Sequence, residues 1–386
     1  MKLADICEIN PRAEVLDDNT LVSFVAMPDV SEDGKINVDT HRTYGEVKKG
    51  FTNFIEGDVL FAKITPCMEN GKGALATGLE NGLGFGSTEF HVLRPDTAIV
   101  LGEWLFYLTS WSAFRKDAEK HMTGSAGQKR VPKSFLVKYE IDVPPIDDQE
   151  YQVLQLNRIR KIIDARRQQI SALDDLIKAR FVEMFGDCKT NPKAWNTVEL
   201  GDISDVGSSK RVFVEELRET GIPFYRGTEV GALAEGKAIT PELFITQEHY
   251  EELIEATGKP LVGDLLMPSI CPDGRIWVVD TEEPFYFKDG RVLWVHSISK
   301  EFDPVFLLYT LKDRIMTDYS SIASGTTFAE LKIFALKQCR VFAVPMDQQK
   351  QFVSFVKQID KSKSVIQKSL DETQLLFDSL MQQYFG

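Results

Sequence analysis

Residues 147–186 read DDQEYQVLQLNRIRKIIDARRQQISALDDLIKARFVEMFG, and this stretch determines the fold that the sequence predicts. It contains neither Gly nor Pro before its last residue, so one uninterrupted helix is expected. A second such stretch, DQQKQFVSFVKQIDKSKSVIQKSLDETQLLFDSLMQQYFG, covers 347–386. Because each follows a proline, in VPPI and in AVPM, we expect the helices to start there, with Asp147 and Asp347 as N-caps.

Both stretches carry apolar residues at the heptad spacing of a coiled coil, with Lys363 and Thr373 as polar breaks in the second. Each helix would be about 60 Å long at about 1.5 Å per residue, too long for one globular domain to cover. We therefore expect the two helices to pack on each other as an antiparallel coiled coil. The expected seam residues are Leu156, Ile159, Ile163, Ile170, Leu173, Ile177, Val356, Ile359, Ile366, Leu370, Phe377 and Leu380.

Outward from these helices, the whole chain repeats itself with a period of about 200 residues. The matches keep the same order in both copies, which favours a duplication over coincidence. Three matching pairs are LADI (3–6) with LGDI (200–203), GDVLFAKITP (57–66) with GDLLMPSICP (263–272), and PIDDQEYQV (145–153) with PMDQQKQFV (345–353).

The parts between the helices mix strand-like runs, such as VLFAKI at 59–64, with helical stretches, such as 102–118. The sequence therefore predicts a mixed α/β (α+β) fold with a pseudo-twofold internal repeat, in which two similar globular domains are separated by two long helices. The expected parts are a first domain at 1–146, a helix at 147–186, a second domain at 187–345 and a helix at 346–386.

Composition places the chain among ordinary globular proteins. It has 386 residues, of which 43% are hydrophobic and 27% charged. No apolar run reaches the roughly 18 residues of a membrane helix, and the N-terminus carries acidic residues where a signal peptide would be apolar, so we expect a cytoplasmic protein without a membrane partner. Five scattered cysteines form no C-x-x-C, and no nucleotide-binding glycine motif occurs, so neither a metal site nor a cofactor is expected.

Two similar modules held apart by a rigid rod can recognise two similar objects at a set distance. Double-stranded DNA presents such objects, because half-sites on one face of B-DNA are separated by a turn of about 34 Å or a multiple of it. Since the modules differ in sequence, the two half-sites should differ as well. The net charge of -13 argues against a protein that coats DNA by charge alone.

The sequence resembles the specificity subunit of type I restriction-modification systems over its whole length. The resemblance rests on LADICEINPR (3–12), GDVLFAKITPCMENGKGAL (57–75), the two helix starts, ARFVEMFGD (179–187) and LGDI (200–203). It departs from the family where Asp148-Gln149 and Gln348-Gln349 stand in place of the usual Glu-Gln.

The resemblance implies a non-catalytic subunit with two target recognition domains, each reading one half of a bipartite DNA sequence. It also implies partners that perform the chemistry. These are two modification (methyltransferase) subunits, which carry S-adenosylmethionine, and restriction (endonuclease and translocase) subunits.

Candidate DNA-binding residues lie in polar loops, TGSAGQKR at 123–130 and ASGTTF at 323–328, where amides and hydroxyls suit phosphate and longer side chains reach base edges. A further set lies in or just after the GDVLFAKITP motif and its copy, and Arg226 is a separate candidate. The alternative is a flexible polar loop for the first two segments, a solvated hairpin for the residues of the GDVLFAKITP motif and its copy, and a surface salt bridge for Arg226. The set comprises Lys63, Thr65, Lys72, Ser125, Gln128, Lys129, Arg130, Arg226, Ser269, Arg275, Ser324, Thr326 and Thr327.

Two other functions stay open at this point. A non-catalytic coiled-coil scaffold would join two protein-binding modules and show no dependence on DNA. A metal-dependent nuclease would use Asp29, Glu46 and Lys48, whose spacing fits such a site.

Two helix features also need an explanation. The basic cluster at 158–167 is interpreted as a solvated face or a partner contact, and it could also follow the phosphates of a DNA spacer. Phe352, Phe355, Phe377 and Phe385 are either contacts for modification subunits or simply core.

Overall fold

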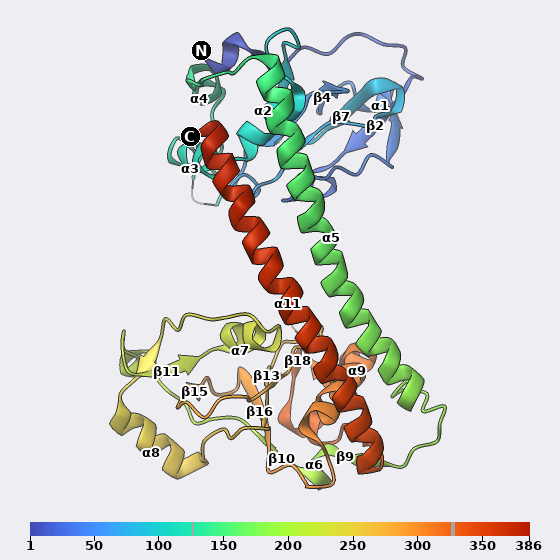
Figure 1. Ribbon diagram of the computed structural model, residues 1–386, viewed down its shortest axis with the longest axis vertical. Helices are drawn as coiled ribbons and strands as arrows, with labels where there is room; N and C mark the ends of the chain where they lie inside the picture. The colour runs from blue at the N-terminus through green and yellow to red at the C-terminus, as the bar shows by residue number, and fades with distance from the viewer. Residues whose placement is uncertain (126, 326–328) are drawn as a thin grey trace. The chain divides into compact units, whose positions relative to one another are not determined.

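The chain divides into two compact units. The computed structural model describes residues 1–125, 127–325 and 329–386. Unit 1 consists of Met1–Gln168 with Gln367–Gly386, and unit 2 of Gln169–Ile366. Each unit therefore contains one globular domain and a part of both long helices, which are α5 (Ile146–Phe185) and α11 (Met346–Phe385) (Figure 1).

Unit 1 contains two four-stranded sheets. The first has the order β1-β8-β5-β6 and is antiparallel throughout; the second has the order β3-β2-β7-β4, with β2 parallel to β7. The strands are β1 (Cys7–Ile9), β2 (Leu21–Val25), β3 (His41–Thr43), β4 (Thr52–Ile55), β5 (Val59–Ala62), β6 (Gly73–Leu75), β7 (Leu83–Gly86) and β8 (Phe90–Pro95). The helices are α1 (Tyr44–Val47), α2 (Gly102–Ser110), α3 (Ser112–Lys120) and α4 (Lys133–Lys138), with 3-10 turns η1 (Leu3–Asp5), η2 (Met27–Asp29) and η3 (Glu80–Gly82).

Unit 2 repeats this plan. Its first sheet has the order β10-β16-β13-β14, and β11 pairs antiparallel with β12 and parallel with β15, as β2 pairs with β3 and β7. The predicted mixed α/β fold with an internal repeat is therefore confirmed. The strands are β9 (Thr197–Glu199), β10 (Asp205–Gly207), β11 (Ile222–Tyr225), β12 (Phe244–Ile245), β13 (Leu265–Pro268), β14 (Trp277–Val278), β15 (Tyr286–Phe287), β16 (Val292–His296), β17 (Ala323–Ser324), β18 (Glu330–Leu331) and β19 (Arg340–Phe342). The helices are α6 (Leu200–Ile203), α7 (Gly227–Ala234), α8 (Gln247–Thr257), α9 (Pro304–Ile322) and α10 (Ile333–Lys337), with the 3-10 turn η4 (Val214–Glu216).

Two details of the predicted helices are wrong. The helical stretch expected at 102–118 is two helices, because Trp111 between α2 and α3 has an extended backbone with ψ at 132°. The long helices begin one residue before Asp147 and Asp347, which lie in the first turn instead of capping it. The carbonyl of Pro145 accepts the first amide bonds of α5, and the carboxylates instead face the positive end of the helix dipole.

A buried glutamine fastens each long helix to its domain. The amide nitrogen of Gln149 donates to the carbonyls of Ile99 (2.9 Å) and Pro144 (2.8 Å), and its oxygen accepts from the amide of Leu101 (2.9 Å). Gln149 has no exposed surface. The side chain therefore joins the loop before α2 to the first turn of α5.

The same fastening occurs in unit 2. Gln349 donates to the carbonyls of Glu301 (2.9 Å) and Val344 (2.7 Å) and accepts from the amide of Asp303 (2.8 Å), again with no exposed surface. An amide suits this position because it both donates and accepts, which a carboxylate or a methyl group does not.

The residues at the heptad positions of α5 and α11 face the other helix and the hydrophobic core in both units. In unit 1 the start of α5 packs beside the end of α11, and Val153 and Leu156 share a core with Met381. In unit 2 Ile177 shares a core with Val356, so the helices run antiparallel in each unit. Of the seam residues, Leu156, Ile159, Ile163, Ile177, Val356 and Leu370 are buried, and Ile170, Leu173, Ile359, Ile366, Phe377 and Leu380 are partly buried.

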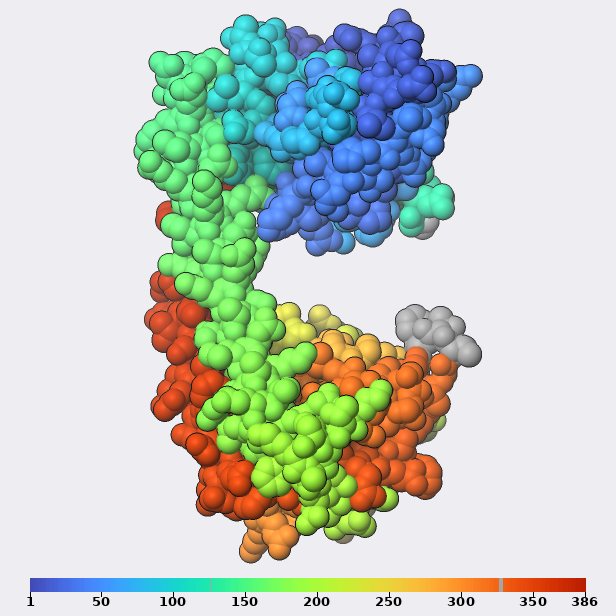
Figure 2. All heavy atoms as spheres, turned by 90° about the vertical axis from the view of Figure 1, so that its right-hand side faces the viewer, coloured from blue at the N-terminus to red at the C-terminus, as the bar shows by residue number. Residues whose placement is uncertain are grey.

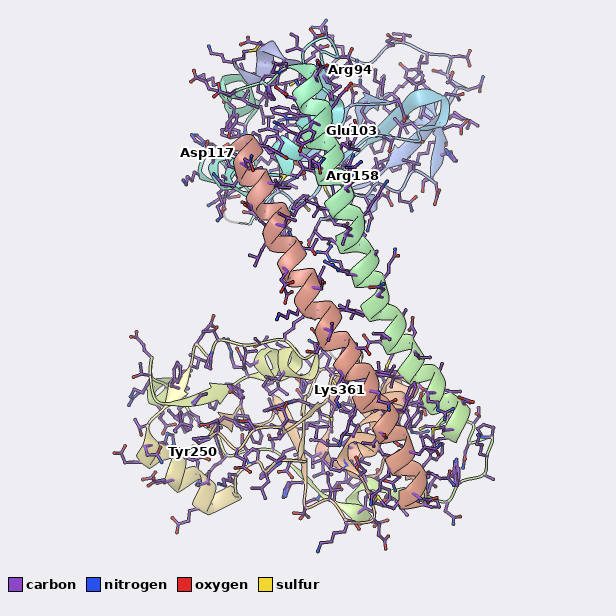
Figure 3. All side chains as sticks on the ribbon, in the orientation of Figure 1. Arg94, Glu103, Asp117, Arg158, Tyr250 and Lys361 are labelled. Atoms are coloured by element: carbon purple, nitrogen blue, oxygen red, sulfur yellow. The ribbon has the colours of Figure 1, made fainter. Side chains whose placement is uncertain are left out.

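Lys363 occupies a seam position and forms an ion pair with Asp174 across the helices at 2.5 Å. The lysine side chain is only 28% exposed. Because surface ion pairs contribute about 0–1 kcal/mol while a buried Leu contributes about 1.5–3 kcal/mol, Lys363→Leu should stabilise unit 2 by about 1 kcal/mol. Chemical denaturation measures this, with the exposed Lys361→Leu as the control (Figure 3). A destabilised Lys363→Leu variant would contradict the seam described above.

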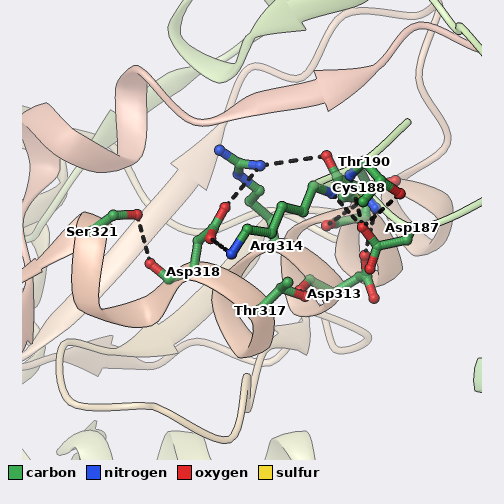
Figure 4. A network of polar contacts seen from close by, with 10 residues as sticks. Asp187, Cys188, Thr190, Asp313, Arg314, Thr317, Asp318 and Ser321 are labelled. Atoms are coloured by element: carbon green, nitrogen blue, oxygen red, sulfur yellow. Dashed lines mark hydrogen bonds and ion pairs between the residues drawn. The ribbon is translucent and has the colours of Figure 1, made fainter. Parts of the chain in front are cut away.

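The end of α5 is anchored to α9 by a polar network (Figure 4). Asp313 accepts from the amide of Cys188 at 3.0 Å, and Arg314 reaches the Cys188 carbonyl and the Asp318 carboxylate. Two backbone amides also donate to Asp187, and they hold its carboxyl pKa below the usual range. The link between α5 and the second domain is thus fixed to that domain.

The aromatic residues of the helices are mainly core. Phe352 has no exposed surface and its ring lies 5.5 Å from that of Phe181 and 5.3 Å from that of Tyr309. Phe377 and Phe385 pack against aromatic rings of α2. Phe355 is partly buried. Phe352 is therefore a core residue of unit 2, and no contact with a modification subunit is needed to explain it.

Within the described residues, no helix is both long enough and apolar enough to cross a lipid bilayer.

Candidate nucleic-acid interface

In unit 1 the fold brings two of the predicted DNA-binding segments together. Strand β5 continues into Lys63, whose amide donates to the carbonyl of Glu89 (2.9 Å) and whose carbonyl accepts from the amide of Val131 (2.9 Å). The amide of Thr65 donates to the carbonyl of Lys129 (3.0 Å). The segment after β5 and the described residues of the following loop therefore form one edge, which we call edge 1 (63–65, 89, 123–125 and 127–131).

Exposed polar side chains cover edge 1. Ser125, Gln128 and Lys129 are exposed, and Lys63 and Thr65 are partly exposed. These groups offer hydroxyl, amide and ammonium donors to phosphate oxygens or base edges, the pattern common at DNA interfaces.

Arg130 is held by Glu89 on edge 1. Its Nε lies 2.9 Å and its Nη2 2.8 Å from the Glu89 carboxylate, while Nη1 donates to the carbonyl of Gln128 at 3.1 Å. The guanidinium lowers the pKa of Glu89, so the carboxylate stays ionised at neutral pH. An exposed ion pair of this kind contributes little to stability, and a bidentate contact of arginine with a base is a strong determinant of specificity. The ion pair is therefore too weak to keep the Arg130 guanidinium from also contacting a base.

Lys72 lies apart from these side chains, since its ammonium donates to the carbonyl of Met27 at 3.1 Å. The matching residue of unit 2 is also engaged. Arg275 forms ion pairs with Asp273 (2.8 Å) and Glu235 (3.9 Å) and lies against Gly231 of α7. Both basic residues therefore support the turn or helix that follows the first parallel strand.

The loop between Lys63 and Lys72 is organised by Arg115 of α3, which sequence reasoning missed. Its Nη1 donates to the carbonyl of Met68 at 2.7 Å and, more weakly, to that of Lys72, and the guanidinium lies 5.1 Å above the ring of Phe61. Burial lowers the pKa of Arg115 to about 10, which leaves it charged at neutral pH. An arginine in a predicted amphipathic helix gives no sequence signal for this inward contact.

Unit 2 has a corresponding edge, edge 2 (269–270, 291, 323–325 and 329–331). The amide of Ser269 donates to the carbonyl of Arg291 (2.9 Å), and the carbonyl of Ser269 accepts from the amide of Leu331 (2.7 Å). Ser324 is exposed and pairs with Glu330 between β17 and β18. The predicted contacts Thr326 and Thr327 lie outside the described residues.

Two predicted contacts of unit 2 are already engaged. Ser269 is 2% exposed, so its hydroxyl does not reach the surface of edge 2. Arg226 forms ion pairs with Glu229 and with Glu242 (3.1 Å), the surface salt bridge weighed as its alternative. Hydrogen bonds from Arg226 and from backbone amides, acting against burial, hold the pKa of Glu229 near about 2.

The basic cluster on α5 is divided between structural and solvated residues. Arg160 donates to the carbonyl of Asp33 and lies over the ring of Phe106, so it fastens the 31–36 turn to the helix. Arg166 donates to the carbonyl of Ser369 on α11 at 2.6 Å. Arg158, labelled in Figure 3, is exposed on α5, which covers one flank of the unit 1 domain in Figure 2.

The nuclease interpretation finds no support in the geometry. Asp29 accepts from the amide of Ala26 (2.8 Å), Glu46 accepts from the amide of Thr43 (2.8 Å), and the Lys48 ammonium binds the carboxylate of Asp18. Asp29 and Glu46 therefore each serve a local turn, and Lys48 pairs with a different carboxylate. In the described ranges of the chain, no three His, Cys, Asp or Glu residues are placed to hold a metal ion.

Cys67 provides a chemical probe of edge 1. It is partly exposed, whereas the other cysteines are buried, and burial raises the pKa of Cys7 and Cys271 to about 12 and that of Cys339 to about 11. At pH 8 we expect a disulfide reagent to modify Cys67 rapidly in the native chain and all five thiols after unfolding. Fast modification of the Cys67→Ser variant would contradict this structure of the site.

Comparison with known proteins agrees with this geometry. The family model "Type I restriction modification DNA specificity domain" matches residues 1–174 and again 192–373. The fold defines a class of proteins with a duplicated α/β domain and two long helices. The chain belongs to the type I restriction-modification DNA specificity family.

Two relatives from Escherichia coli are the specificity subunits of the type I restriction enzymes EcoAI and EcoEI, 36% and 35% identical over 224 residues. Each match covers 56% of this chain but only 38% of the relative, so the chain spans well under half of the length of these relatives.

Solved structures share the fold over almost the whole chain. One such structure comes from work on complex assembly and conformational transition of the type I R-M system. It has a TM-score of 0.56 at 19% identity, and the alignment covers 99% of this chain and 96% of the other chain. The type I S subunit from M. genitalium has a TM-score of 0.54 at 14% identity, covering 100% and 95%.

Proposed function

We propose that this chain is the DNA sequence-specificity subunit of a type I restriction-modification complex. In this proposal, residues 1–146 and 187–345 are target recognition domains that each read one half of a bipartite double-stranded DNA target. The helices 147–186 and 346–386 set the distance between the half-sites. The observation that carries the proposal is the repetition of one polar edge, edge 1 and edge 2, at the same place in two duplicated domains.

The chain itself is non-catalytic in this proposal. Methyl transfer is performed by two modification subunits and cleavage by restriction subunits, which assemble around the chain on DNA in the cytoplasm. The engagement of Asp29 and Glu46 in local turns, and of Lys48 with Asp18, supports this view of the chain.

Genome-wide methylation mapping tests the proposal. Cells with the gene should show a split motif, two half-sites separated by a fixed gap, that disappears when the gene is deleted and returns on complementation. An identical set of methylated sites with and without the gene would refute the proposal and favour the coiled-coil scaffold.

DNA binding by the isolated chain should be weak. With a net charge of -13 and Arg130, Arg226 and Arg275 each held by carboxylates, little positive charge is free to bind phosphate. A gel shift should therefore detect tight specific binding only after modification subunits are added. Tight, salt-sensitive binding by the chain alone would contradict this expectation.

A further inference from the structure

One position of edge 1 and one position of edge 2 make the same backbone hydrogen bond and are therefore equivalent. The amide of Lys63 donates to the carbonyl of Glu89 just before β8, and the amide of Ser269 donates to the carbonyl of Arg291 just before β16. Glu89 and Arg291 therefore occupy the same place in the duplicated fold.

A second pair of equivalent positions lies where each recognition loop returns to the sheet. The amide of Val131 donates to the carbonyl of Lys63, and that of Leu331 donates to the carbonyl of Ser269. The residues immediately before them, Arg130 and Glu330, are therefore equivalent as well.

These two positions carry an ion pair in both units, but with the charges exchanged. In unit 1 the strand supplies the carboxylate of Glu89 and the loop supplies Arg130. In unit 2 Arg291 lies just before β16, and the carboxylate belongs to Glu330 of β18, which also accepts from Lys332 at 2.9 Å. The exchange keeps the link between loop and strand and moves the guanidinium from one side of the edge to the other.

In both pairs the guanidinium is the more exposed partner. The side chains of Arg130 and Arg291 are 42% and 57% exposed, against 25% and 23% for Glu89 and Glu330. Each carboxylate thus lies behind a guanidinium that faces solvent.

The chemistry of such a pair suits base recognition better than phosphate binding. A guanidinium neutralised by a carboxylate has little attraction for a phosphate, and the flexible, exposed Lys129 is better suited to that role. The planar fork of arginine matches the O6 and N7 acceptors of guanine in the major groove.

We propose that Arg130 and Arg291 are the specificity-determining residues of the two edges, each donating to a guanine of its own half-site, and that Glu89 and Glu330 are positioning residues that orient them. This inference rests on the proposed function. Because the arginine lies in the 127–131 segment in unit 1 and just before β16 in unit 2, the guanines occupy different positions in the two half-sites.

The test uses the native cells, with the chromosomal gene replaced by Arg130→Lys or Arg291→Lys, followed by methylation mapping. Lysine keeps the positive charge and the ion pair but loses the bidentate fork. We expect Arg130→Lys to raise methylation at sites lacking guanine at one position of one half-site at least about tenfold, with the other half-site unchanged. Arg291→Lys should do the same in the other half-site only.

Two controls separate base reading from a structural link. Arg180→Lys, in an ion pair with Glu183 on α5, should leave the motif unchanged. The double exchange Glu89→Arg with Arg130→Glu restores the ion pair with the charges of unit 2, and it should alter the base requirement of the first half-site.

Each remaining outcome counts against the inference. An unaltered motif in both lysine variants and in the double exchange means that the pairs only fasten the loops. Uniform loss of methylation at all sites in the lysine variants means that the arginines serve general binding or folding. If the wild-type gene directs no split motif, the proposed function fails, and the inference fails with it.

Discussion

Replacing Phe352 by alanine should lower the free energy of unfolding of unit 2 by about 4 kcal/mol, the middle of the range for a buried phenylalanine. The side chain has no exposed surface, and it meets the rings of Phe181, Phe185 and Tyr309 at 5.5, 5.6 and 5.3 Å between centroids. Alanine would leave a cavity where α5, α9 and α11 meet. The midpoint of thermal unfolding should fall by about 10 °C.

A matched substitution isolates the effect of burial. Phe334 on α10 is 73% exposed, so Phe334→Ala should change the stability of unit 2 by no more than about 0.5 kcal/mol. Chemical denaturation of both variants gives the comparison. Equal losses for Phe352→Ala and Phe334→Ala would show that Phe352 is not the junction of helices described above.

Gln149→Leu should destabilise unit 1 by about 3 kcal/mol, although leucine is similar in size and better suited to a core. The substitution leaves the amide of Leu101 and the carbonyls of Ile99 and Pro144 unpaired inside the protein. Each buried, unpaired polar group costs about 1–3 kcal/mol, and the costs are not fully additive. Gln349→Leu should destabilise unit 2 by a similar amount, because its three partners are equivalent.

The control for this prediction is Gln168→Leu, an exposed glutamine on the same helix, which should be close to neutral. Calorimetry distinguishes the two variants. A Gln149→Leu variant as stable as the wild type would contradict the role of this side chain as the fastening between domain and helix.

The long helices could be predicted because their signals are local and repeated. Heptad spacing and the absence of glycine and proline extend over 40 residues in both α5 and α11, so single exceptions such as Lys363 do not obscure the pattern. The first helix starts at Ile146, one residue before the expected 147, because a proline favours a boundary without fixing its position.

The contacts that organise the candidate interface join residues far apart in the chain. Local sequence patterns do not reveal such contacts. Arg115 reaches the carbonyl of Met68, and Arg291 meets Glu330, only after the strands have assembled. Ser269 looks like a loop hydroxyl in the sequence but follows a buried strand closely enough to be buried with it. Gln149 lies in the first turn of a helix, where a glutamine is expected to be exposed to solvent.

The measurement that tests the central claim most directly lengthens the coiled coil. Three heptads are inserted in α5 after Gln168 and three in α11 after Ile366, which adds about 31 Å at about 1.5 Å per residue and keeps the seam in register. Because a turn of DNA spans about 34–36 Å, methylation mapping should return both half-sites unchanged, with a gap longer by about one turn. A gap of the original length would contradict the claim that the two helices set the distance between the half-sites.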